Sequence, residues 1–191
     1  MTRISTFRLV AGTLAASAFT VLLAVLGTMA LAAPDKYNVK VPNGLAFSDF
    51  RGYEDWQTVT VSQIESSNLL RAILANPVMI NAYRAGIPDN GKPFPNGSKI
   101  AKIEWTQKKI TEAPWSVSTP DTMVETLKVV ELIEKDTKRF PDTHGWGYAE
   151  FAYDAASDTF KPAVKDAKCG AQCHEIAGRP KDYIFNAYAK R

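Results

Sequence analysis

Short runs of apolar and β-branched residues, separated by polar turns, predict that strands make up most of this chain. Such residues pack well on a pleated sheet. The runs cover residues 57–61, 69–74, 98–105 and 126–133, and a further one begins at 148. The run 126–133 also fits a helix, because apolar residues recur every three positions from Val124 to Ile133. We expect a strand there because the run is β-branched.

Two stretches predict short helices. Aromatic residues recur every three positions from Phe47 to Trp56, which predicts an amphipathic helix whose rings anchor the core. Asn76 and Pro77 predict a second helix start, since asparagine caps a helix and proline suits its first turn, and Gly86 predicts its end. We expect loops at 87–97, 114–120 and 155–167. The fold class expected is α+β, a mainly antiparallel sheet with a few short helices.

The N-terminal segment reads as an export signal. Arg3 and Arg8 are followed by an uncharged stretch up to Ala33, and Ala30-Leu31-Ala32 offers a small-x-small cleavage site. We expect residues 1–32 to be a signal peptide and residues 33–191 to form one periplasmic domain. A retained membrane anchor is the alternative, because the apolar stretch exceeds the roughly 20 residues that span a bilayer.

Charge excludes one class of partner. The formal net charge is +3, and loss of the two arginines of the signal leaves the mature chain close to neutral. Such a balance provides no electrostatic basis for binding nucleic acid or an anionic membrane surface.

A cluster near the C-terminal end carries the most specific chemistry. It runs Cys169-Gly170-Ala171-Gln172-Cys173-His174 and contains both cysteines of the chain. Attachment of haem c needs two thiols for the vinyl groups and a following histidine for the iron, although the usual motif has two residues between the cysteines rather than three. Because separations of three and four residues both return to one side of a helix, the extra residue is compatible with attachment. A single thioether through Cys173 stays open.

Two other interpretations of the cluster are weaker. A Cys169–Cys173 disulfide would close a small loop and leave His174 without a role. A zinc site would need about four ligands, so His144 would have to join the cluster. Export favours haem, because c-type maturation follows translocation. His174 is then the proximal ligand of the haem iron.

The opposite side of the iron decides what such a haem does. A second strong ligand would make the protein an electron carrier, whereas an open position would make it a binder or a catalyst. The mature chain offers Met79, Met123 and His144 as second ligands. Met79 fits a helix core, Met123 follows a proline-rich loop and His144 lies in a turn, so the sequence favours an open site.

Three further groups of residues follow one another along the chain in a characteristic order. Phe94-Pro95-Asn96-Gly97 runs into a strand that carries Lys102, Lys135–Phe140 precedes Gly145-Trp146-Gly147, and Asp182-Tyr183-Ile184-Phe185 follows the cysteine cluster. Together these stretches resemble the cytochrome P-460 family, which includes the cytochrome c-prime-beta proteins, over roughly residues 47–188.

The resemblance implies a mostly antiparallel fold, often dimeric, with one haem c and an open distal side. In the family's catalytic branch a lysine is cross-linked to the porphyrin and the enzyme oxidises hydroxylamine, passing electrons to an acceptor. In the c-prime-beta branch the cross-link is missing and an apolar pocket binds nitric oxide. The family's lysine corresponds to Lys102, with Lys99 as the near alternative. From the residues alone, Lys102 shares a mixed face with Ile100 and Glu104, where a lysine is usually solvated.

These observations predict a haem protein that acts on hydroxylamine or nitrogen oxides, with a small nitrogenous substrate or gas and a periplasmic electron acceptor as partners. A positioned carboxylate would accept protons, and Glu104, Glu131 and Glu150 lie on predicted strands. The alternatives are a non-catalytic nitric oxide binder, an electron carrier, and an exported domain with a disulfide and no haem. The aromatic residues Tyr183, Phe185 and Tyr188 are expected to pack against the haem.

Overall fold

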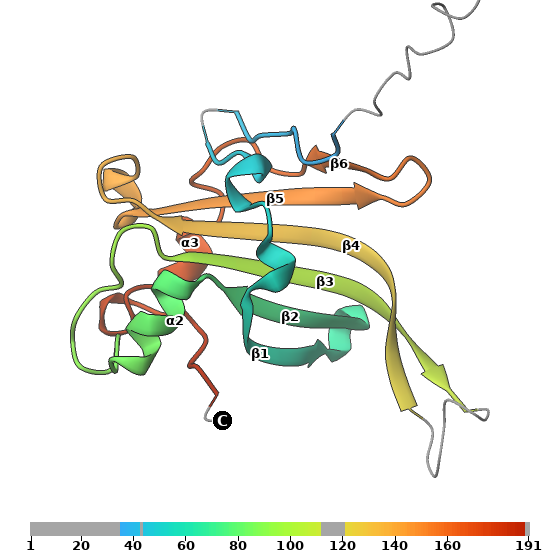
Figure 1. Cartoon of the computed structure of the whole chain (residues 1–191), viewed down its shortest axis with the longest axis horizontal. Coiled ribbons are helices and arrows are strands. Elements are labelled where there is room, and N and C mark those ends of the chain that lie inside the picture. Colours follow the sequence, from blue (N-terminus) through green and yellow to red (C-terminus); the bar gives the residue numbers. More distant parts are fainter. Residues whose placement is uncertain (1–34, 43, 112–120, 190–191) are drawn as a thin grey trace, which may run out of the picture. The chain divides into compact units, whose positions relative to one another are not determined.

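The computed structural model describes residues 35–42, 44–111 and 121–189, so the predicted export segment and the predicted loop 114–120 lie outside the described residues. Six antiparallel strands form one sheet whose spatial order follows the sequence, from β1 to β6 (Figure 1). The strands are β1 (Gln57–Ile64), β2 (Leu69–Ala75), β3 (Lys99–Ile110), β4 (Asp121–Lys135), β5 (Trp146–Asp154) and β6 (Thr159–Pro162). The expected α+β class with few short helices is confirmed, and within the described residues no helix has the length and hydrophobicity needed to span a membrane.

The helical segments are short. They comprise α2 (Pro77–Arg84), α3 (Ala171–His174) and the 3-10 helices η1 (Phe47–Phe50), η2 (Tyr53–Asp55), η3 (Glu65–Ser67), η4 (Pro141–Thr143) and η5 (Arg179–Lys181). The predicted start of α2 is confirmed: the Asn76 side chain accepts a hydrogen bond from the Met79 backbone N–H at 3.1 Å, and Pro77 occupies the first turn. Gly86 follows the helix with a φ of +84°, as a terminating glycine does.

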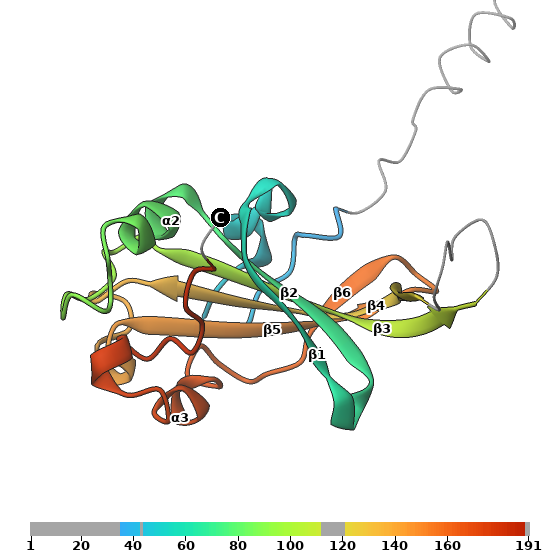
Figure 2. The same ribbon diagram turned by 90° about the horizontal axis from the view of Figure 1, so that it is seen from below.

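The sheet has two different faces. On one face, the N-terminal segment and η1 bury Phe47 and Phe50 against inward-facing strand residues such as Ile103 and Phe151. On the other face, α2 and the C-terminal segment pack around a second apolar cluster, which includes Ile73, Ile100, Ile133, Tyr148 and Ile184. Figure 2 shows the 3-10 helices of the N-terminal region and α3 on opposite sides of the sheet. The predicted alternation of β3 side chains between the two faces is therefore confirmed, because Ile103 lies on the first face and Ile100 on the other.

Three sequence predictions need correction. The aromatic stretch from Phe47 forms two 3-10 helices rather than one helix, because Gly52 between them adopts a left-handed φ of +76°. The segment 155–167 is not wholly a surface loop: it contains β6, which pairs with β5 and buries Phe160. The helical alternative for 126–133 is wrong, because this segment belongs to β4.

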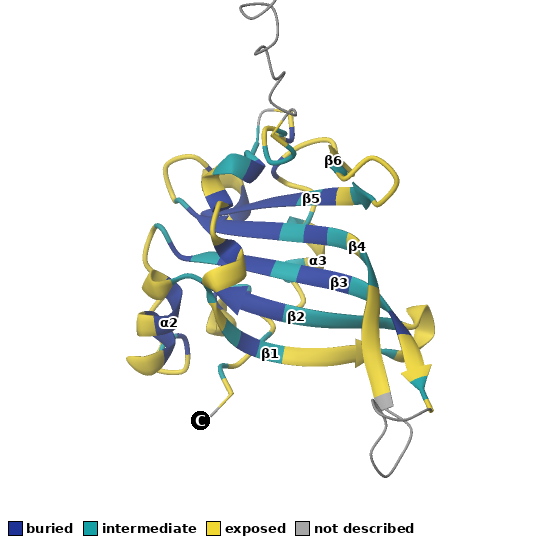
Figure 3. Cartoon of the chain, turned by 45° about the vertical axis from the view of Figure 1, so that its right-hand side comes forward, coloured by how far each residue is buried: buried dark blue, intermediate teal, exposed yellow. Residues whose placement is uncertain are grey.

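β3 and β4 extend further than the sequence predicts. Figure 3 shows their far ends mainly exposed, whereas the middle of the sheet is buried. Met123 lies on this extension and is 40% exposed. The buried half of the sheet is the part that meets α3, so this half positions the site described next.

Candidate functional site

A cavity of about 390 Å³ lies between the second face of the sheet, α3 and the C-terminal segment 184–186. Six of the residues that the sequence singled out for chemistry line it together: Lys102, Glu131, Glu150, Cys169, Cys173 and His174. Ile73, Ile100, Ile133 and Tyr148 supply apolar and aromatic parts of the wall. Residues separated by more than 70 positions in the sequence thus share one site because β3, β4, β5 and α3 converge there.

Close packing at Gly170 brings the cysteine cluster against the sheet. A Cβ atom on Gly170 would lie 2.5 Å from Cδ1 and 2.7 Å from Cγ of Tyr148, so only glycine allows this approach. Cys169 precedes α3 and Cys173 lies within it, and both side chains line the cavity. The three-residue spacing therefore still presents both thiols to the same space.

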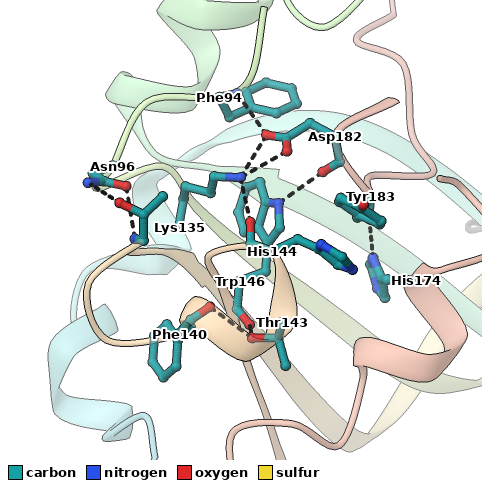
Figure 4. A network of polar contacts seen from close by, with 11 residues as sticks. Phe94, Asn96, Lys135, Phe140, Thr143, His144, Trp146, His174, Asp182 and Tyr183 are labelled. Atoms are coloured by element: carbon teal, nitrogen blue, oxygen red, sulfur yellow. Dashed lines mark hydrogen bonds and ion pairs between the residues drawn. The ribbon is translucent and has the colours of Figure 1, made fainter. Parts of the chain in front are cut away.

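His174 is held in a defined orientation. Its Nδ1 lies 2.5 Å from the backbone carbonyl oxygen of Tyr183 (Figure 4), so Nδ1 carries the proton and Nε2 is the nitrogen available to a metal. The rings of Tyr148 and Phe185 lie 4.8 Å and 4.9 Å from the imidazole ring, centroid to centroid. Burial lowers the pKa of His174, which favours the neutral form that binds metals.

The sheet supplies a charged group of residues to the same cavity. Lys102 and Glu131 are direct cross-strand partners, and the Lys102 Nζ lies 2.5 Å from a Glu131 carboxylate oxygen and 3.3 Å from one of Glu104. Glu150 is the cross-strand partner of Glu131 on the next strand. Burial raises the pKa of Glu131 despite the opposing effect of the Lys102 charge, which brings this carboxylate closer to the range of a general base.

The cysteines are free thiols rather than a disulfide. Although part of Cys169 reaches the surface, desolvation of the sulfur and then the charge of Glu150 raise its pKa to about 11, so the thiol stays protonated at neutral pH. Over the described ranges, no group of three or more His, Cys, Asp or Glu side chains is arranged to hold a metal ion. His144, which the zinc interpretation required, instead contacts Glu175 at 2.7 Å.

The residues proposed as a second iron ligand do not line the cavity. Met79 is fully buried in the second apolar cluster, Met123 is exposed on the extension of β4, and His144 stacks on Tyr183. Lys99, the alternative to Lys102, bonds the Asp49 carbonyl oxygen at 2.7 Å and also stays outside the cavity.

The structure also places the remaining candidate residues. Glu104 does not line the cavity but pairs with Lys102. Of the three aromatic residues near the C-terminus, Phe185 lines the cavity, whereas Tyr183 stacks on His144 and Tyr188 stacks on Tyr83.

Sequence reasoning missed two features of the site. Arg71 lines the cavity, and its Nε lies 3.7 Å from the Glu104 carboxylate. The strand period could have found it, because Arg71 shares a face with Ile73 on β2. The second feature is the buried ion pair between Lys135 and Asp182, with a distance of 2.8 Å, for which the sequence carried no signal beyond the family resemblance.

The family model for cytochrome P460 matches residues 50–186. The chain belongs to the cytochrome P460 family. The matched range covers all six strands and the cysteine cluster, so the earlier resemblance is confirmed. A comparison with curated proteins found no match.

Cytochrome P460 proteins are haem proteins, so membership makes this chain a cytochrome with a haem iron cofactor. The cavity of this P460 member suits that group: it offers two free thiols, one imidazole with a single nitrogen left free, and apolar side chains beside the charged group on the sheet. These are the donors that covalent haem attachment and axial ligation require.

Proposed function

We propose that this chain is an exported c-type cytochrome that oxidises hydroxylamine or handles related nitrogen oxides. The observation that carries the proposal is the composition of one cavity. One wall holds Cys169, Cys173 and His174, and the sheet wall holds Lys102 and Glu131. In this proposal the two thiols would hold haem c through thioether bonds to its vinyl groups, and Nε2 of His174 would bind its iron.

Bound haem supplies an iron that binds a small nitrogenous molecule and exchanges electrons. The residues of the chain supply the rest. Protons accompany the electrons removed from hydroxylamine, and Glu131 accepts them because its pKa is raised by burial and its carboxylate lines the cavity. Ile73, Ile100 and Ile133 limit water around the substrate. The electrons pass to a redox partner in the periplasm.

Lys102 decides between two versions of this function. As the residue that corresponds to the family's cross-linked lysine, it provides the amine for a porphyrin cross-link in the catalytic version. The second candidate function is nitric oxide binding without turnover, and one observation favours it: Glu131 and Glu104 both contact the Lys102 ammonium. These two ion pairs hold the Lys102 Nζ against the sheet, so the nitrogen is not free to reach a porphyrin edge.

One preparation tests the proposal. The chain is produced with c-type maturation machinery, and intact mass and the absorption spectrum are recorded. We expect the mass of one covalently attached haem. A red-shifted spectrum, a Lys102–haem peptide and hydroxylamine-dependent reduction of an acceptor would support the catalytic version. An ordinary c-type spectrum with nitric oxide binding would support the second candidate.

Matched variants make this test specific. Lys102→Leu should restore an ordinary haem spectrum if the cross-link forms, whereas Lys99→Leu should leave the spectrum unchanged because Lys99 lies outside the cavity. A colourless protein without added mass would refute the proposal, and a haem protein inert to both hydroxylamine and nitric oxide would refute both candidate functions.

Export and assembly are tested separately. We propose cleavage after Ala32 and release into the periplasm, with a retained membrane anchor as the alternative. The N-terminal sequence of the protein recovered from the periplasmic and membrane fractions distinguishes the two. We also propose a homodimer, as the family resemblance implies, and light scattering of the purified holoprotein tests it.

A further inference from the structure

We infer that the buried ion pair between Lys135 and Asp182 is a positioning device for the imidazole of His174. The inference rests on the axial role proposed for His174. It concerns residues outside the cavity, because neither Lys135 nor Asp182 lines the space beside the cysteines.

The link begins at the acceptor of the imidazole proton. The Tyr183 carbonyl oxygen that accepts from Nδ1 of His174 belongs to a left-handed turn, in which Asp182 has a φ of +46° and Tyr183 a φ of +63°. A non-glycine residue rarely adopts a left-handed conformation and keeps it only where its surroundings impose it. The direction of this carbonyl therefore depends on whatever holds the turn.

Asp182 is held at both its side chain and its backbone. Lys135 Nζ donates to the two carboxylate oxygens at 2.8 Å and 3.0 Å, and the Phe94 backbone N–H donates to one of them at 2.8 Å. The indole N–H of Trp146 donates to the Asp182 carbonyl oxygen at 2.9 Å. Figure 4 shows these contacts converging on Asp182 immediately before Tyr183.

Lys135 also supports Tyr183 from a second direction. Its ammonium donates to the His144 backbone carbonyl oxygen at 3.0 Å, and the His144 ring stacks on the Tyr183 ring with centroids 4.0 Å apart and planes inclined by 7°. Lys135 is 3% exposed, so these contacts are made largely out of water, where charge-assisted hydrogen bonds are strong. The Lys135 ammonium, at the end of β4, thus contacts both Asp182 and the backbone of His144, the two residues that hold the turn at Tyr183.

The physical consequence concerns the basicity of the axial ligand. A histidine that donates its second N–H to a well-placed acceptor is a stronger donor to the metal through its other nitrogen. A fixed Tyr183 carbonyl therefore favours the ferric state. If the turn loosens, the hydrogen bond weakens and the reduction potential rises.

The test uses the haem-loaded protein without any substrate, so it is independent of the proposed reaction. Removing one partner would strand a buried charge and risk unfolding, so the main variant is the double substitution Lys135→Met/Asp182→Asn. We expect about a tenfold shift of the haem redox equilibrium towards the reduced form, equivalent to a rise of about 59 mV for a one-electron couple. The iron–histidine stretching frequency of the ferrous protein should fall.

Two further variants complete the design. Arg139→Gln removes another ion pair at the same end of β4, the one with Glu134 at 3.0 Å, and should leave the potential and the stretching frequency unchanged. His144→Asn removes the exposed stacking ring and keeps a residue that tolerates the left-handed φ of +57° at this position. It should shift both readouts in the same direction as the double variant, by a smaller amount.

The outcomes separate the possibilities. A folded double variant whose potential and stretching frequency match those of Arg139→Gln would overturn the inference, because the ion pair would then serve folding alone. If the double variant yields no folded holoprotein, the His144→Asn variant decides, and unchanged readouts overturn the inference. Failure of the wild-type protein to bind haem would instead refute the proposed function, and the absorption spectrum reveals that case directly.

Discussion

Substitution of Gly170 by alanine tests how the cysteine cluster is seated. The backbone of Gly170 is ordinary, with φ −89° and ψ −12°, so alanine meets no conformational barrier there. The difficulty is contact: the added methyl group would lie 2.5 Å, 2.7 Å and 3.1 Å from Cδ1, Cγ and Cβ of Tyr148. Because Tyr148 is a buried strand residue, the ring cannot turn away freely, and the segment that carries both thiols has to lift from the sheet.

The expected cost follows from this overlap. Overpacking by one methyl group in a well-packed region costs about 1–3 kcal/mol. For a chain of this length each kcal/mol lowers the melting temperature by about 2–4 °C, so Gly170→Ala should lower it by about 2–12 °C. Since Cys169 and Cys173 move together away from the cavity, the fraction of protein that carries covalent haem should also fall.

Intact mass measures the haem-loaded fraction, and circular dichroism measures the melting temperature. Gln172→Ala is the matched control, because this side chain lies in the same motif but is exposed. A Gly170→Ala protein that melts and incorporates haem like the control would show that the contact with Tyr148 does not set the position of the cluster.

Three further predictions follow from the cavity, the sheet edge and the helix cap. Turnover of hydroxylamine should increase with pH through a pKa above the ordinary carboxyl range, because burial raises the pKa of Glu131 and a base acts when deprotonated. In pH–rate profiles, Glu131→Gln should abolish this pH dependence. Glu125→Gln, on the exposed part of β4, should keep the pH dependence. Phe160→Ala should lower the free energy of unfolding in urea by about 3–5 kcal/mol, since the ring is 7% exposed. The control Val61→Ala, at a residue 64% exposed, should have a free energy of unfolding within about 0.5 kcal/mol of wild type. Asn76→Ala should cost about 2 kcal/mol in the same assay, because it removes the cap contact to Met79 and two further hydrogen bonds; equal stability would contradict the structural role of this side chain.

Local patterns in the sequence were sufficient for most of the fold. Five of the six strands and α2 were predicted, because β-branched runs and the Asn-Pro cap act over a few neighbouring residues. β6 escaped detection since its four residues contain one inward-facing ring, Phe160, which is too short a repeat to show a period. The sequence also did not predict the separation of η1 and η2 at Gly52, because the aromatic spacing from Phe47 fits both one helix and two short turns.

The chemistry of the site divides in the same way. The sequence alone determined that two thiols and an imidazole lie together, and the period of β3 determined that Lys102 and Glu104 share a face. Only the tertiary structure decided that Glu131 contacts Lys102, that Met79, Met123 and His144 lie outside the cavity, and that Asp182 supports the turn beside His174. These are contacts between residues far apart in the chain, and they depend on strand register and on the close approach at Gly170, which no local pattern encodes.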